Sequence, residues 1–192
     1  MPLNRRDVVR RMLADRGDAL VVAGLGSPAW DVAAAGDDDC NFYLWGGMGG
    51  AAMMGLGLAL AQPDRRVIVV TGDGEMLMGL GSLATIAVQR PPNLSIVVLD
   101  NGRFGETGMQ ESHTAGPTRL PAVAAACGFV HVLDVVSVEE LDAAAATAIR
   151  GGHGPWFVRV AVAAEELPRV LPERDGAILK DRFRAAVGAD HR

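Results

Sequence analysis

Two runs of apolar residues, separated by a stretch of helical character, constrain the fold most. RVIVVT (residues 66–71) and SIVVLD (residues 95–100) are predicted as strands that carry apolar side chains on both faces. Residues 75–89 lie between them and are predicted as one helix, which ends before Arg90-Pro91-Pro92. Strands that are apolar on both faces and are joined by a helix are typical of a parallel sheet covered by helices on its two sides.

The same alternation continues along the chain. Further strands are predicted at residues 19–24, 41–45, 129–135 and 155–162. Helices are predicted after Asn4, from Ser27-Pro28, within residues 46–61, at residues 120–127 and from Ser137, where Glu140 completes a capping box. Residues 101–118 are predicted as a polar loop. We therefore expect one three-layer α/β/α domain over residues 1–192, with a mostly parallel central sheet and a C-terminal tail from about residue 163 that holds an amphipathic helix near residues 175–187.

Charge and composition argue against several classes of protein. The net charge of −5 argues against a nucleic-acid surface. The two cysteines, Cys40 and Cys127, form no CxxC pair, so structural zinc is not expected and both are predicted to be small buried residues. The N-terminal residues lack the apolar core of a signal peptide, and the apolar residues 46–61 are too few to span a bilayer. We expect a cytoplasmic protein without membrane contact.

Two further sets of residues have only structural predictions. The basic pairs on the first helix, Arg5-Arg6 and Arg10-Arg11, are expected to be solvated. Four methionines are expected in the core: Met53, Met54, Met76 and Met78.

An acid between two glycines marks the point where the strand at residues 66–71 meets the next helix. In open α/β sheets ligands bind at the carboxyl ends of strands, and helix N-termini attract phosphate. Gly72 and Gly74 would let the backbone approach an anion closely, but Asp73 would repel one. A divalent cation between carboxylate and phosphate removes this conflict, and Mg²⁺ prefers such oxygen ligands. The sequence therefore predicts a metal–diphosphate site at Asp73.

A second metal ligand is expected from the neighbouring strand end. Asn101 follows the strand at residues 95–100, and its side-chain carbonyl is a neutral oxygen ligand. The loop at residues 102–105 could turn a backbone carbonyl toward the same ion. Two structural alternatives stay open: Asp73 could cap a helix, and Asn101 could start a turn with Gly102.

This pattern resembles the signature of thiamine diphosphate enzymes, here GDGEMLMGLGSLATIAVQRPPNLSIVVLDN. The first position of the family's usual Asn-Asn pair is Asp100. WGGMGGAAMMGLGLALAQPDRRVIVVTGDG resembles the family's Gly-Ser-Met-Gly segment, and LGSPAWD resembles its first phosphate-side loop. Together these segments cover roughly residues 19–129. The resemblance implies the thiamin diphosphate-binding fold and the cofactors thiamine diphosphate and Mg²⁺.

The resemblance also implies roles for individual residues. Metal ligands would be Asp73, Asn101 and the carbonyl of Arg103. Backbone N–H groups toward the diphosphate would come from Gly26, Ser27, Gly74 and Glu75. The Gly46 carbonyl would accept a hydrogen bond from the cofactor's 4′-amino group, and Met48 would hold the cofactor in its bent form. Gly47, Gly72 and Phe104 complete the expected cofactor-binding set.

The family needs a second domain type, which binds the pyrimidine and supplies a catalytic glutamate. The 192 residues leave no room for such a domain. The resemblance therefore implies a partner chain, a pyrimidine-binding alpha subunit that carries the glutamate. A hetero-oligomer, α₂β₂ or a multiple of it, would follow.

The loop NGRFGETGMQESHT resembles that of sulfopyruvate decarboxylase beta subunits and of phosphonopyruvate decarboxylase. This resemblance implies a carboxy-lyase that acts on a three-carbon 2-oxoacid with an acidic group at C3. Residues 108–114 depart from the usual Gly-Gln-Pro-Thr. Glu106 and Glu111 would disfavour a dianionic substrate if they pointed inward. His113 could contact an anionic substrate or transfer a proton, or be a loop residue without a chemical role.

Other functions stay open from the sequence. The same cofactor supports carboligation, as in acetolactate synthases, and 2-oxoacid oxidation. Residues 47–52 approximate the G-x-G-x-x-A of nicotinamide-binding folds, but the acid expected near residue 70 is absent. A silent regulatory subunit is a further alternative, because the catalytic glutamate would lie on another chain.

Overall fold

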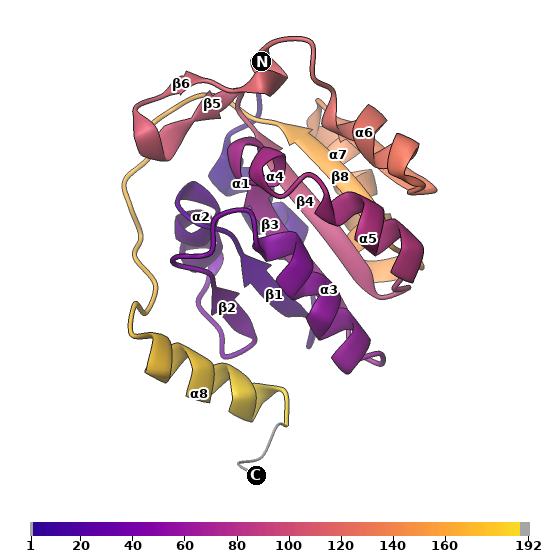
Figure 1. Ribbon diagram of the computed structural model, residues 1–192. Coiled ribbons are helices and arrows are strands. Elements are labelled where there is room, and N and C mark those ends of the chain that lie inside the picture. Colours follow the sequence, from indigo (N-terminus) through magenta and orange to yellow (C-terminus); the bar gives the residue numbers. More distant parts are fainter. Residues whose placement is uncertain (1, 189–192) are drawn as a thin grey trace.

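A six-stranded, entirely parallel sheet forms the centre of the computed structural model, which describes residues 2–188 (Figure 1). Every residue of β1 and β4 is buried, as expected for strands with helices on both sides. The strands, in spatial order, are β2 (Asn41–Tyr43), β1 (Leu20–Ala23), β3 (Val67–Gly72), β4 (Leu94–Asp100), β8 (Trp156–Ala161) and β7 (His131–Val135).

Helices cover both faces of the sheet and enclose two separate apolar cores, one on each face. One face carries α1 (Arg5–Leu13), α2 (Ser27–Ala35) and α7 (Val138–Ala144), which continues as a π-helical stretch over Ala145–Gly151. The other face carries α3 (Ala51–Ala61), α4 (Asp73–Met78), α5 (Ser82–Gln89) and α6 (Leu120–Cys127). The predicted three-layer α/β/α architecture is confirmed.

The single helix predicted over residues 75–89 is wrong, because residues 79–81 break it into α4 and α5. Gly79 lies so close to the preceding glycine-rich turn that a Cβ there would come within 2.2 Å of the Gly49 carbonyl oxygen. The close approach of these two segments requires a glycine and interrupts the helix. The loop predicted at residues 101–118 also contains an unexpected hairpin, formed by β5 (Arg103–Phe104) and β6 (Gln110–Glu111).

The C-terminal segment runs from β8 along the side of the molecule to helix α8 (Gly176–Ala186) beside the edge strand β2 (Figure 1). We call residues 163–175 the strap. The Arg169 guanidinium lies 4.7 Å from the ring centre of Trp30, and Trp45 donates a hydrogen bond to the Glu173 carbonyl at 2.8 Å. Leu179 and Phe183 of α8 join different cores, so the helix closes the sheet at this edge.

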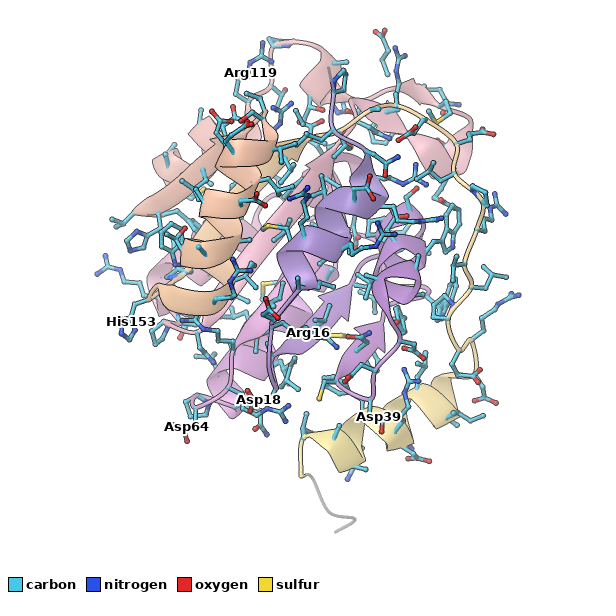
Figure 2. All side chains as sticks on the ribbon, turned by 180° about the vertical axis from the view of Figure 1, so that it is seen from behind. Arg16, Asp18, Asp39, Asp64, Arg119 and His153 are labelled. Atoms are coloured by element: carbon cyan, nitrogen blue, oxygen red, sulfur yellow. The ribbon has the colours of Figure 1, made fainter. Side chains whose placement is uncertain are left out.

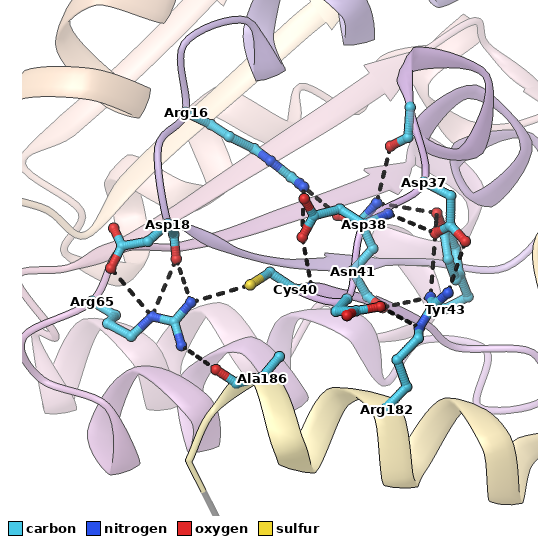
Figure 3. Close-up of polar contacts among 12 residues, drawn as sticks. Arg16, Asp18, Asp37, Asp38, Cys40, Asn41, Tyr43, Arg65, Arg182 and Ala186 are labelled. Carbon is cyan, nitrogen blue, oxygen red and sulfur yellow. Dashed lines mark hydrogen bonds and ion pairs between the residues drawn. The ribbon is translucent and has the colours of Figure 1, made fainter.

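A chain of polar contacts holds α8 to the amino ends of the strands (Figure 3). Arg182 bonds Asp37 at 2.8 Å, and the Tyr43 hydroxyl donates to the same carboxylate at 2.8 Å. Asn41 donates to the Tyr43 oxygen at 3.1 Å and accepts from Arg16 at 2.5 Å. We call these five residues the amino-end network.

Several side chains lie where the sequence did not predict them. Met76 is buried as expected, but Met53, Met54 and Met78 are 42%, 38% and 60% exposed. For Met53 and Met54 the reason is that α3 turns mainly its small residues toward the sheet. Arg5, expected in solvent, is only 3% exposed. Cys40 and Cys127 are half-buried instead of fully buried. Within residues 2–188, no helix combines the length and the apolar character that crossing a bilayer requires.

Candidate functional site

A cavity opens at the carboxyl ends of β1, β3 and β4. Strand β1 lies between β2 and β3, so the chain turns to one side after β1 and to the other side at β3. Such a reversal of strand order leaves a crevice where ligands bind in open α/β sheets. The cavity is lined by Arg5, Leu25, Ser27, Pro28, Met48, Gly72, Asp73, Gly74, Glu75, Met78, Leu99, Asn101, Arg103, Phe104, Gly105, Glu106, Thr107 and Val162.

Glycine at position 74 allows two walls of the cavity to meet. A Cβ on Gly74 would come within 2.7 Å of the Phe104 ring. The hairpin that follows β4 therefore packs directly on the first turn of α4, and it brings Asn101 and Arg103 beside Asp73 in one cavity.

Asp73 is a buried carboxylate without a cationic partner. It is 2% exposed, and no arginine, lysine or histidine in the described part of the chain forms an ion pair with it. Its Oδ2 accepts hydrogen bonds from the Ser112 hydroxyl and, at 3.1 Å, from the Thr114 hydroxyl. Burial raises the pKa of Asp73; the Ser112 hydrogen bond opposes this rise, and the charge of Asp100 adds to it. A cation beside Asp73 would relieve the cost of this buried charge.

Asp100 is joined to Asp73 through one hydroxyl. Thr114 Oγ1 lies 2.7 Å from an Asp100 oxygen, and because a hydroxyl carries one proton it donates to only one of the two carboxylates at a time. Arg159 bonds the other Asp100 oxygen at 2.8 Å. The acid at position 100, which departs from the family's Asn, therefore has its own cation.

Glu75 turns its side chain into the protein. Its Oε2 accepts from the Thr71 hydroxyl at 2.8 Å, and its buried Oε1 has no hydrogen-bond partner among residues 2–188. Burial raises the pKa of Glu75, and the Thr71 hydrogen bond opposes this. The sequence predicted a role only for the backbone of Glu75, so its inward carboxylate was missed.

The predicted metal ligands would form a mixed set of oxygen donors. Asn101 Oδ1 accepts from the Arg103 N–H at 2.9 Å, so Asn101 does form the turn that the sequence left open. A carbonyl oxygen has a second lone pair, so this turn leaves room for a metal. In the described chain no three His, Cys, Asp or Glu side chains form a group that could hold a metal ion by themselves. The donors available here are one carboxylate, one amide and one backbone carbonyl, which suits Mg²⁺ better than zinc.

Most of the predicted cofactor-binding residues line the cavity, but three of them, and the predicted catalytic residue His113, do not. Gly26 lies at its rim, where the Glu106 carboxylate packs against it; a Cβ on Gly26 would come within 2.4 Å of Glu106. Gly46 and Gly47 belong to the turn before α3 and are outside the lining. His113 is exposed and meets the Phe104 ring edge-on at 6.0 Å between centres, so its predicted contact with substrate stays untested.

Sequence reasoning missed several residues of the site. Ser112 and Thr114 were part of a quoted loop, and their hydroxyls were the available signal for a partner of Asp73. Glu106 was considered only as an obstacle to substrate, and it does line the cavity. Arg5 had no signal, because nothing local in the sequence distinguishes it from Arg10 or Arg11.

Residues 34–160 match the family model described as thiamine pyrophosphate enzyme, C-terminal TPP binding domain. A sulfopyruvate decarboxylase subunit beta from Methanothermobacter thermautotrophicus is 38% identical over 185 residues, which cover 95% of each chain. A phosphonopyruvate decarboxylase from Streptomyces viridochromogenes is 43% identical over 185 residues, 93% of this chain. This chain spans 45% of that longer relative.

A solved structure has the same fold. It is described as a thiamin diphosphate-dependent enzyme from Mycobacterium smegmatis, and it superposes with a TM-score of 0.73 at 23% identity. The similarity covers 86% of this chain and 32% of the other.

Proposed function

The chain belongs to the thiamine pyrophosphate enzyme family through its C-terminal cofactor-binding domain, and from this premise we propose that it is one subunit of a split decarboxylase. It binds thiamine diphosphate and Mg²⁺ and, with a partner, removes CO₂ from sulfopyruvate or phosphonopyruvate. The observation that carries the proposal is Asp73, a buried carboxylate without a cation at the crevice of the sheet. Because the chain belongs to this family, we no longer consider the nicotinamide-binding fold that residues 47–52 suggested.

The residues in and around the cavity have three roles. Asp73, Asn101 and the Arg103 carbonyl hold the metal. Ser27, Gly72, Gly74 and Glu75 line the cavity, and with Gly26 at its rim they present backbone to the diphosphate. The exposed Met48, together with Gly46 and Gly47, supports the ring end of the cofactor.

When bound, thiamine diphosphate supplies a carbon nucleophile and an electron sink for the carboxylate that leaves a 2-oxoacid. This chain contributes binding and orientation. Ser112 and Thr114 fix the Asp73 carboxylate, and Leu25, Leu99 and Phe104 supply apolar parts of the cavity wall.

A partner chain supplies the pyrimidine-binding domain and the catalytic glutamate. Exposed methionines surround the cavity mouth and α3: Met48, Met53, Met54 and Met78. Adaptable apolar side chains on a surface are typical of protein interfaces. The relative from Methanothermobacter thermautotrophicus has nearly the same length and is named as a subunit, which supports a hetero-oligomer, α₂β₂ or a multiple.

The test is co-purification of the tagged chain from its native cell, followed by mass spectrometry of the proteins that accompany it. The complex is then given thiamine diphosphate, Mg²⁺ and sulfopyruvate or phosphonopyruvate. We expect a short partner chain, release of CO₂ and a free aldehyde. A hydroxyketone or an oxidised acyl product would instead indicate carboligation or oxidation. Turnover by the purified chain alone would contradict the split enzyme.

A further inference from the structure

One arginine of the first helix lies in the cofactor cavity and not in solvent. Arg5 is 3% exposed, whereas the side chains of Arg10 and Arg11 on the same helix are 57% and 49% exposed. Arg5 lines the cavity together with Ser27 and Asn101. Burying a charged guanidinium costs free energy, so a buried arginine is expected to have partners or a role that offsets this cost.

Two contacts fix the Arg5 guanidinium. Its Nε donates to Asp31 Oδ2 at 2.7 Å, and its Nη1 donates to the Glu165 carbonyl of the strap at 2.5 Å. Its Nη2 has no hydrogen-bond partner in the described part of the chain. The side chain is therefore held in one position with one edge of its fork unused.

Arg5 shares its ion-pair partner with a second arginine. Asp31 is fully buried and accepts from both Arg5 and Arg6, the latter at 3.1 Å. Burial raises the pKa of Asp31, and the charge and hydrogen bond of Arg5 oppose that rise. Two cations therefore share this one buried carboxylate, while Glu106, Glu165 and Glu166 line a second cavity beside Arg5 without an ion pair to it. Three acids line the cofactor cavity, Asp73, Glu75 and Glu106, and none of them forms an ion pair with Arg5.

Resting on the proposed function, we infer that Arg5 binds the diphosphate of the cofactor. A guanidinium fork held beside Ser27 and Asn101 offers a charged donor to phosphate oxygens. The strap, through the Glu165 carbonyl, positions this donor. The N-terminal helix thus supplies a binding residue that lies far in sequence from the Gly-Asp-Gly segment.

Arg6 provides a matched control. It bonds the same Asp31 and also reaches the strap, at the Pro168 carbonyl, 2.7 Å away, but it does not line the cavity. Arg5→Gln and Arg6→Gln therefore each remove one ion pair and one contact to the strap. Only the first removes a charge from the cavity.

The experiment is calorimetric titration of the chain with two probes, magnesium thiamine diphosphate and magnesium diphosphate. We expect Arg5→Gln to weaken both affinities by about 10- to 100-fold, as loss of a charged hydrogen bond does, and Arg6→Gln to change them by less than about twofold. Arg5→Lys keeps the charge without the fork and should fall between wild type and Arg5→Gln. It also serves as the test if Arg5→Gln does not fold.

The results separate the inference from the proposed function. If the wild-type chain binds both probes and Arg5→Gln binds them equally well, Arg5 is not a ligand. If Arg5→Gln and Arg6→Gln weaken binding equally, Arg5 only fastens the strap, and the inference again fails. A wild-type chain that binds neither probe would overturn the diphosphate site proposed for this chain, and the inference about Arg5 with it.

Discussion

The acids at the two ends of the parallel sheet have different partners. At the amino ends, Asp37 is paired with Arg182 and hydrogen-bonded by Tyr43. At the carboxyl ends, Asp100 is paired with Arg159, but no cationic side chain within residues 2–188 forms an ion pair with Asp73 or Glu75. In Figure 2, Arg119 lies near one end of the molecule, and Asp18, Asp39 and Asp64 lie toward the other.

The pKa values of Asp37 and Asp73 are shifted in opposite directions. Burial alone would raise the pKa of Asp37, but hydrogen bonds from Arg182 and Tyr43 outweigh it and lower that pKa. Burial raises the pKa of Asp73, and the hydrogen bonds from Ser112 and Thr114 do not outweigh it. The amino-end network therefore contributes to stability, whereas the carboxyl end holds a charge that costs stability until a cation arrives. Substitutions at the two ends should separate these contributions.

The largest expected effect is on metal binding. Asp73→Ala removes the only charged ligand proposed, so we expect the Mg²⁺-dependent affinity for thiamine diphosphate to fall by about a thousandfold or more, about 4 kcal/mol. Calorimetry measures the affinity, and thermal unfolding of the cofactor-free chain should show no loss of stability, because an unpaired buried charge is removed. Unchanged affinity would end the metal assignment.

The next largest effect is expected on stability, from a substitution in α8 beside the edge strand β2. Phe183→Ala removes the α8 side chain that meets Phe42 at 5.4 Å between ring centres, and we expect a loss of about 3 kcal/mol in the free energy of unfolding. Ile178→Ala on the exposed side of α8 is the control, with a loss below about 0.5 kcal/mol. Urea unfolding measures both. A large loss of diphosphate affinity in Phe183→Ala would break the separation of the two ends.

A smaller effect is expected at the hydroxyl between the two acids. Thr114→Val removes the donor shared by Asp73 and Asp100, and we expect about a tenfold weaker Mg²⁺-dependent affinity for diphosphate, the usual effect of losing a partner of a metal ligand. Thr147→Val, which removes a hydroxyl bonded to a helix carbonyl far from the cavity, is the control. Equal affinities in the two variants would show that Thr114 does not position Asp73.

The smallest effect should depend on pH. The lowered pKa of Asp37 means that its contribution to stability is present above 3.8, the ordinary aspartate value, and is lost as the pH falls through the lower folded-state pKa. Asp37→Asn should therefore destabilise the chain at about pH 6 by less than about 1 kcal/mol, since the pair is partly exposed. The difference from wild type should shrink toward about pH 3. A difference that grows as the pH falls would reverse the assignment.

Much of the fold could be predicted because it depends on local patterns. The apolar runs of β3 and β4 fixed a parallel sheet, and strand ends are where ligands bind, so Asp73 and Asn101 could be chosen before any contact was known. The break after α4 could not be predicted, since it depends on the approach of Gly79 to Gly49. Arg5 was misplaced for the same reason: its partners are Asp31 and residue 165.

The contacts of the first helix with the strap have a consequence for the order in which the chain folds. Leu3 pairs with Val162, and Arg5 meets a carbonyl 160 positions later in the sequence. Contacts of such long range form late, because the intervening chain must first be ordered. During synthesis, α1 must wait for nearly the whole domain to emerge before Arg5 is fixed. The cavity should therefore become competent only in the last step of folding, after the sheet is complete.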